Sequence, residues 1–227
     1  QLPNPSAHSR HNCQTLRHIL GKSDNPSVYK KAFEAKNDSA KKGRDRLVEF
    51  IRMINHADQR DFALKLESKM LVEDFLRVSA VMLLSGAFDQ LTGWNPHNYY
   101  LYHDANDDRW RYLPWDLDVG FSETAFGRIH VLADWNAAWP VVPNGSANPL
   151  MERIIGDPTL LKRYRSVAQM ILNKYFEPER LSKAIDAKYN LIKEDLKADP
   201  FAHRRVTNPN DRSYEDIVEL IKKFVRA

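Results

Sequence analysis

The stretch from Val72 to Leu84 constrains the fold most, because it is apolar on nearly every face of a helix. One stripe at three- and four-residue spacing consists of Val72, Phe75, Leu76, Ser79, Ala80 and Leu83. Further apolar residues between them cover the other faces. A helix of this kind is buried in the middle of a domain. We therefore predict that it is the central helix and that it leads the chain to Gly86 and Asp89.

Other helical patterns lie on both sides of this segment. Before it, apolar residues recur with helical spacing over residues 44–54 and 61–69. After it, prolines that suit the first turn of a helix stand at 149, 158 and 178, and they predict helices of which the last two run to about 175 and 198. Ser213 has the spacing of a helix cap before a final helix. Most of the chain is therefore expected to be helical.

One β-hairpin is predicted in the middle of the chain. Residues 98–102 are rich in aromatic side chains, residues 104–108 form a polar turn, and residues 110–113 alternate between large and polar side chains. Residues 120–147 show no steady period and read as a long irregular segment. We predict an α+β fold that is mainly α, in which a helical lobe carries a central hairpin.

Composition restricts the class of protein only broadly. The 227 residues contain 43% hydrophobic side chains, enough for a sizeable core, and a net charge of +4 that identifies no partner. The single Cys13 cannot form an internal disulfide, and no apolar stretch is long enough to span a membrane. Residues 1–28 are polar and predict a weakly ordered or partial segment before one domain at 29–227. Because the chain starts without Met and ends within a helical pattern, we expect a fragment of a longer protein.

Polar side chains gather at the two ends of the predicted hairpin. Asn98 begins it, and Asp116 and Asp118 follow it, while Asp89 lies a short way upstream, after the central helix. A hairpin brings its ends together, so these oxygen atoms are expected to form one cluster. Oxygen ligands favour Mg²⁺ or Mn²⁺, whereas no Cys or His pair has the spacing of a zinc site.

The order of these residues suits phosphoryl transfer. Protein kinases use a catalytic Asp, then an Asn that binds a metal ion, and then an Asp after a following hairpin. Asp89, Asn98 and Asp116 occur in that order. A carboxylate at a strand end can also simply cap a turn, so each aspartate taken alone has a purely structural explanation.

Longer strings in the same region resemble a known family. Phe88-Asp89, then 97–102 (His-Asn-Tyr-Tyr-Leu-Tyr) and 113–118 (Leu-Pro-Trp-Asp-Leu-Asp), are similar to the spore-coat protein H (CotH) kinase family. The similarity extends over about residues 29–227. It implies an atypical protein-kinase fold in which Asp89 is the catalytic base, Asn98 and Asp116 bind the metal, and Asp118 supports them. Asn95 is an alternative to Asn98.

The resemblance also implies substrates and a location. Members use ATP with Mg²⁺ to phosphorylate Ser or Thr of coat or secreted proteins, which implies an extracellular, cell-surface or spore-coat protein with no nucleic-acid partner. Lys36 is a candidate contact for the ATP phosphates. The strand-rich amino-terminal part with which the family grips the triphosphate does not occur in these residues, so we expect this chain alone to bind ATP weakly or to be inactive.

Two other functions stay open on the sequence. A non-catalytic coat or adhesin-like protein of the same family would keep the fold without turnover. A metal-dependent hydrolase or nuclease would use the same acidic cluster without a nucleotide cosubstrate, and Trp94 and Trp115 could then stack on bases. Magnesium-dependent consumption of ATP separates the kinase from the non-catalytic protein, and activity without a nucleotide indicates the hydrolase.

Overall fold

A computed structural model describes residues 25–30, 33–87, 89–91, 97–118, 120–122, 124–125, 129–130, 148–200 and 213–227 of the chain. Its helices before the hairpin are the short 3₁₀ turn η1 (Pro26–Tyr29), α2 (Asp38–Lys42), α3 (Arg44–His56), α4 (Gln59–Lys69) and α5 (Val72–Leu84). The strands are β1 (Tyr99–Asp104), β2 (Arg109–Pro114), β3 (Thr124–Ala125) and β4 (Ile129–His130). The later helices are α6 (Pro149–Gly156), α7 (Pro158–Tyr175), α8 (Pro178–Ala198) and α9 (Tyr214–Arg226).

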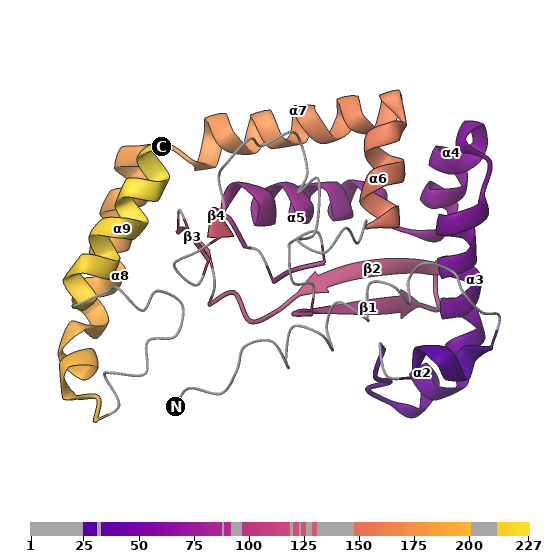
Figure 1. Cartoon of the computed structure of the whole chain (residues 1–227), viewed down its shortest axis with the longest axis horizontal. Helices are drawn as coiled ribbons and strands as arrows, with labels where there is room; N and C mark the ends of the chain where they lie inside the picture. The colour runs from indigo at the N-terminus through magenta and orange to yellow at the C-terminus, as the bar shows by residue number, and fades with distance from the viewer. Residues whose placement is uncertain are drawn as a thin grey trace.

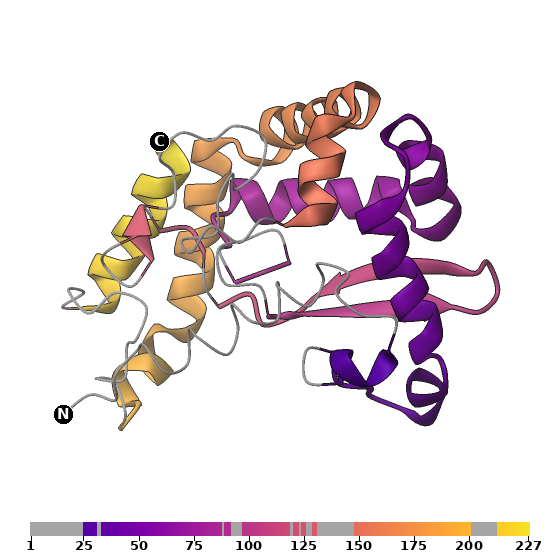
Figure 2. The same cartoon turned by 45° about the vertical axis from the view of Figure 1, so that its right-hand side comes forward.

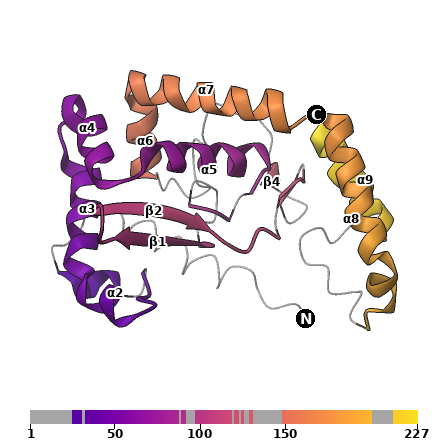
Figure 3. The same cartoon turned by 180° about the vertical axis from the view of Figure 1, so that it is seen from behind.

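These elements form a layered arrangement around α5. Figure 1 shows α7 running along one side of α5 and the β1–β2 hairpin along the other, and α5 contacts both α7 and β2. Helices α3 and α4 stand at one end of the layers, and the paired helices α8 and α9 stand at the opposite end (Figures 1 and 3). The predicted mainly helical α+β fold with a central hairpin is therefore confirmed.

Helix α5 is the centre of the core, as its sequence predicts. Its residues Phe75, Leu76 and Ala80 are almost completely buried. They belong to one continuous cluster that also includes buried side chains from α3, α4, α6 and α7, among them Ile51, Phe62, Leu66, Ile154, Leu160 and Tyr164. The expectation that α5 is buried on all sides is too strong, because Val81 is 37% exposed on the face that opens toward the end of α7.

The β1–β2 hairpin presents one face to this core and the other to solvent. Its antiparallel register pairs Tyr99 with Pro114 and Asp104 with Arg109. Trp110 and Tyr112 point inward, where Trp110 stacks on Phe50 and Tyr112 packs edge-on against Phe75. The backbone of Leu71, between α4 and α5, donates a hydrogen bond to the Trp110 carbonyl at 3.0 Å. The hairpin is thus fixed to the start of the central helix.

The helix starts follow from local sequence. Asn148, Asp157 and Glu177 each accept hydrogen bonds from the first turn of the following helix, and each precedes a proline. Ser213 caps α9 by accepting from the Asp216 backbone N–H at 3.0 Å, as predicted. Helix α4 begins at Gln59 rather than at the predicted residue 61, because Asp58 caps the Arg60 N–H at 2.9 Å.

Two expectations about irregular segments have different outcomes. Within the predicted irregular segment 120–147, the described residues include a short antiparallel ladder, since Thr124 pairs with His130 and Ala125 with Ile129. The predicted weak order of residues 1–28 concerns positions of which only 25–28 are described, and these form the start of η1. No described helix is long and apolar enough to cross a membrane.

Candidate functional site

The candidate site lies where α5 ends and the open ends of the hairpin approach it. The chain turns sharply at Gly86, whose φ of 68° is a conformation that glycine adopts readily. Figure 2 shows the chain that follows α5 beside the open end of the hairpin, the end away from the β1–β2 turn. Asp89 follows the turn and is 4% exposed, so its carboxylate is held inside the protein by a rigid helix end.

Asp89 and Asn98, which only eight residues separate along the chain, are in direct contact. The Asn98 side-chain amide donates to Asp89 Oδ2 at 2.5 Å, and both side chains are buried. The backbone N–H groups of His97 and Asn98 both donate to the Asp89 carbonyl, each at 3.1 Å. The other carboxylate oxygen, Oδ1, is buried and has no hydrogen-bond partner among the described residues. An unpartnered buried carboxylate oxygen is costly, and it is available to accept a proton or a ligand.

The protonation of Asp89 reflects this environment. Burial raises the pKa of Asp89 to about 6, while the neighbouring His97 and the Asn98 hydrogen bond oppose the rise. The negative charge of Asp118 adds to the rise, so Asp118 lies within electrostatic reach of Asp89. His97 Nε2 is 3.9 Å from Asp89 Oδ2. His97 is not among the site residues predicted from the sequence, and its position directly before Asn98 is the signal that could have identified it.

Asp116 and Asp118 lie on an exposed segment that follows the hairpin. The Trp115 backbone N–H donates to the Asn98 carbonyl at 3.1 Å, which joins the two ends of the hairpin directly in front of Asp116. Asp116 has a φ of 55°, a left-handed conformation that Asp tolerates better than most residues. The side chains of residues 115–118 are exposed, so both carboxylates face solvent.

A buried set of hydrogen bonds that the sequence did not predict lies behind these carboxylates. Gln90 is completely buried; its amide nitrogen donates to the Trp115 carbonyl at 3.1 Å, and its amide oxygen accepts from the Tyr112 hydroxyl at 3.1 Å. The Leu91 backbone N–H donates to that same hydroxyl at 3.3 Å. Asn148, the cap of α6, donates to the Leu91 carbonyl at 2.7 Å. Residues 89–91 are thus bonded to the hairpin and to α6.

The side-chain oxygen atoms of Asp89, Asn98, Asp116 and Asp118 suit an open site in which Mg²⁺ also binds a substrate. Among the described residues, no group of three or more His, Cys, Asp or Glu is arranged to hold a metal ion. Mg²⁺ keeps several waters and commonly uses only one or two carboxylates together with substrate phosphates. The buried oxygen of Asp89, the solvent-facing carboxylates of Asp116 and Asp118, and the Asn98 amide suit that mode rather than a closed protein cage. Asn95, the alternative ligand, lies outside the described residues.

No contact that the structure describes joins Lys36 to Asp89, Asp116 or Asp118. Its ammonium group pairs with Glu34 at 2.6 Å, and this hydrogen bond raises the pKa of Lys36, with a smaller contribution from Tyr100. Tyr100 stacks on Trp115 with ring centres 5.9 Å apart, and the two rings are 40% and 45% exposed. Tyr100 is thus within electrostatic reach of Lys36, and its stacking partner Trp115 directly precedes Asp116.

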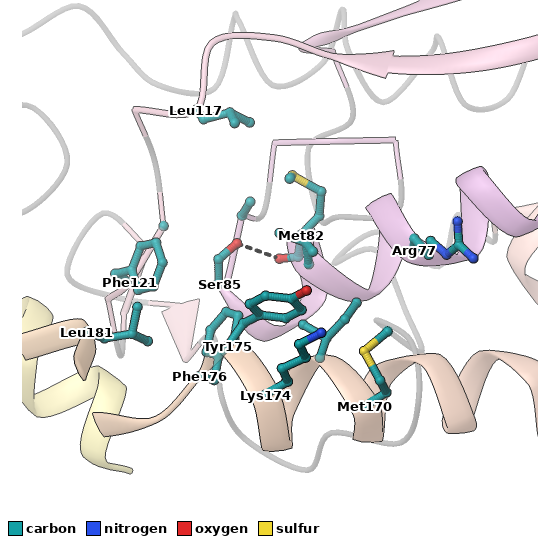
Figure 4. A pocket seen from close by; sticks show the side chains of 14 residues that line it. Arg77, Met82, Ser85, Leu117, Phe121, Met170, Lys174, Tyr175, Phe176 and Leu181 are labelled. Atoms are coloured by element: carbon teal, nitrogen blue, oxygen red, sulfur yellow. Dashed lines mark hydrogen bonds between the residues drawn. The ribbon is translucent and has the colours of Figure 1, made fainter. Parts of the chain in front are cut away.

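A separate cavity lies beside Leu117, Gly120 and Phe121. It has a volume of about 660 Å³ and is bounded by the end of α5, the end of α7 and the start of α8 (Figure 4). Its walls are mostly apolar, with Arg77 and Lys174 as the charged residues and no carboxylate in the lining. None of the candidate carboxylates lines this cavity, so we place the candidate site at Asp89.

Comparison with known proteins agrees with these motifs. A family model described as CotH kinase protein matches residues 11–227, and the chain belongs to the CotH kinase family. The chain is similar to a particular member, the inner spore coat protein H of Bacillus subtilis (strain 168), with 25% identity over 176 residues. That alignment covers 78% of this chain and 45% of the relative, so the chain matches less than half of the relative's length. The resemblance expected from the sequence is confirmed.

Proposed function

We propose that this chain is the catalytic part of a Mg²⁺- and ATP-dependent Ser/Thr protein kinase. The observation that carries the proposal is the buried Asp89–Asn98 pair, within electrostatic reach of Asp118. One Asp89 carboxylate oxygen has no hydrogen-bond partner among the described residues, and burial raises the pKa of Asp89 to about 6. A general base works best when its pKa lies near the working pH and when its position is fixed. The order Asp, Asn, hairpin, Asp matches the arrangement of catalytic groups in protein kinases, and the family name points to the same activity.

In this proposal each residue has a distinct task. Asp89 accepts the proton of a Ser or Thr hydroxyl while the hydroxyl oxygen bonds to the γ-phosphorus of ATP and ADP leaves with the electrons of the broken P–O bond. Asn98, Asp116 and Asp118 would hold Mg²⁺, which neutralises charge on the phosphates when bound. The exposed Tyr100–Trp115 pair gives a flat surface on which the adenine ring can stack, and Lys36, within electrostatic reach of Tyr100, would contact phosphate.

The proposed setting follows from the relative. Its name describes an inner spore coat protein, which supports a coat or other extracellular location and a coat protein as the phosphate acceptor. Because the chain matches 45% of that relative, full ATP affinity is expected to require parts of the family fold beyond the matched region.

The test measures transfer of the γ-phosphate from labelled ATP to serine and threonine, located by mass spectrometry in the chain itself and in an added Ser-rich acceptor protein. At ATP concentrations high enough to offset weak binding, the intact chain with Mg²⁺ is expected to transfer phosphate, and Asp89→Asn to lose at least 100-fold of the rate with an unchanged affinity for ATP. Asp74→Asn, at an exposed position on α5, is the matched control and is expected to keep the full rate. Equal rates for Asp89→Asn and the control contradict the assignment of Asp89 as the base.

The second candidate is a coat protein without turnover, which the relative's name also supports. It predicts that the chain folds and shows no magnesium-dependent phosphate transfer, with or without Asp89. A metal-dependent hydrolase instead predicts release of inorganic phosphate from ATP, or cleavage of another substrate, with no labelled serine or threonine.

A further inference from the structure

Gln90 is placed where it can control the geometry of the candidate site without entering it. Its side chain is completely buried, so it cannot touch ATP, a metal ion or an acceptor protein. It follows Asp89 directly in the chain, and its amide reaches across to the residue that precedes Asp116. It therefore lies between the two halves of the site, the Asp89 side and the Trp115–Asp118 side.

Both polar atoms of the Gln90 amide form hydrogen bonds, one as a donor and the other as an acceptor. The nitrogen donates to the Trp115 carbonyl at 3.1 Å, and the oxygen accepts from the Tyr112 hydroxyl at 3.1 Å. Only a side chain with one donor and one acceptor at this length can make both bonds. A glutamate would set a carboxylate oxygen against the Trp115 carbonyl, and an aliphatic residue would leave that carbonyl and the tyrosine hydroxyl without their partner.

The bond to Trp115 completes the fixation of that residue's backbone. The Trp115 N–H is already bonded to the Asn98 carbonyl, so its N–H and C=O groups are both held, each by a residue next to Asp89 or in contact with it. The held carbonyl belongs to the peptide unit that leads into Asp116, whose left-handed backbone sets the direction of the exposed carboxylates. Losing the bond frees this peptide unit to rotate.

We infer that Gln90 is a positioning residue that fixes the Asp116–Asp118 segment relative to Asp89. The inference rests on the proposed function only in treating these two segments as halves of one catalytic site. A fixed separation matters because the catalytic base and a metal-bound phosphate must be held in one relative geometry. Small displacements from that geometry lower the reaction rate by large factors.

The first test needs no enzymatic activity. Gln90→Met keeps the length and removes both hydrogen bonds, whereas Tyr112→Phe removes only the hydroxyl. Backbone amide hydrogen exchange of the intact chain is measured for each. Gln90→Met is expected to speed exchange at both Leu91 and Trp115 by at least tenfold, and Tyr112→Phe to speed it mainly at Leu91, while amides in the middle of α5 keep their protection. Equal acceleration throughout the chain means that Gln90 only stabilises the core, and it overturns the inference.

The second test separates positioning from general stability. Gln90→Met is expected to lower kcat at least tenfold and to raise the Mg²⁺ concentration for half-maximal rate, with less than a threefold change in the KM for ATP at saturating Mg²⁺. Leu76→Ala, in the core of α5 and far along the chain from the site, is the control for lost stability, and at a temperature where it is folded its Mg²⁺ dependence should be unchanged. A Gln90→Met chain with normal kcat and normal Mg²⁺ dependence overturns the inference. If the unmodified chain transfers no phosphate, the proposed function fails, and the exchange experiment still decides the role of Gln90.

Discussion

At the scale of single residues, Asp89 combines features that are unfavourable for stability and useful for proton transfer. Its carboxylate is buried, has one oxygen without a described partner, and lies near the charge of Asp118. All of these favour the protonated form, and the Asn98 hydrogen bond only partly compensates. Residues of this kind are often retained because function requires them and not because they stabilise the fold.

Asp89→Asn is expected to stabilise the metal-free chain at neutral pH. Because the pKa of Asp89 is raised from 3.8 to about 6, the folded chain holds this proton more tightly than the unfolded chain. Its contribution to stability is therefore complete below about pH 4 and is lost as the pH rises through about 6. Asparagine never ionises, so the variant should gain up to about 3 kcal/mol above pH 7 and almost nothing at pH 4.

Urea unfolding of both chains at pH 4, 6 and 8 measures this difference in free energy. Asp74→Asn, whose carboxylate is exposed and 3.7 Å from Arg77, should change stability by less than about 1 kcal/mol at every pH. If the difference in unfolding free energy between Asp89→Asn and the unmodified chain does not increase with pH, the Asp89 carboxyl group is not buried in its ionised form.

Asp116→Asn is expected to weaken Mg²⁺ binding without disturbing the backbone. Asparagine accepts the left-handed conformation found at this position, where φ is 55°, and the exposed side chain makes no core contact. Loss of one carboxylate ligand should weaken binding of Mg²⁺ in the presence of ATP at least tenfold, as measured by calorimetry. Asp61→Asn, an exposed carboxylate on α4, is the control; similar affinity in the two variants removes Asp116 from the ligand set.

At the scale of elements, α5 and the hairpin were predictable, and the contacts that complete the site were not. The apolar pattern on all faces of residues 72–84 predicts the helix, and the aromatic residues predict the two strands. Both predictions succeed because hydrophobic periodicity and structural propensity are local properties of the sequence. The proximity of Asp89 to Asn98 was also expected, because only eight residues lie between them. Gln90 and Tyr112 carry no local signal, since their partners are 25 and 22 residues away along the chain and depend on how the turn after α5 is packed.

Truncation of the central helix should be costly. Leu76 is completely buried at the centre of α5, and Leu76→Ala is expected to lower the free energy of unfolding by roughly 2–5 kcal/mol. Leu64→Ala on α4, where the side chain is 71% exposed, is the matched control and should cost less than about 1 kcal/mol. Both values are measured by urea unfolding at one pH, and similar losses in the two variants would contradict the position of α5.

At the scale of the whole molecule, aromatic contacts connect the site to the far helices. Phe121, shortly after Asp118, stacks on Phe176 between α7 and α8 with ring centres 6.2 Å apart. It also packs edge-on against Phe224 of α9 at 5.8 Å. Phe224 is the buried residue of α9, and α8 has none, so this small cluster accounts for much of the apolar contact between the helix pair and the rest of the chain.

Phe224→Ala is therefore expected to release α9 before the rest of the fold. The loss of a buried phenylalanine should cost roughly 3–5 kcal/mol, and hydrogen exchange should accelerate in α9 far more than in α5. Leu220→Ala, on the same helix with a side chain that is 37% exposed, serves as the control and should leave exchange in α9 nearly unchanged. Uniform acceleration across both helices would mean that α9 unfolds only together with the core.

The contact between Gly120 and the end of α5 has a further consequence. The Phe121 N–H is bonded to the Ser85 carbonyl at 2.6 Å, and a methyl group at Gly120 would come within 3.0 Å of that same oxygen. With Trp115 held to Asn98 at the other end, Asp116, Leu117 and Asp118 lie on a short bridge between two fixed supports. A bridge of this kind loses little conformational entropy when it takes up a ligand, so more of the binding free energy is retained as affinity. Lengthening it by a single glycine after Asp118 should weaken ligand binding even though every charged group is kept.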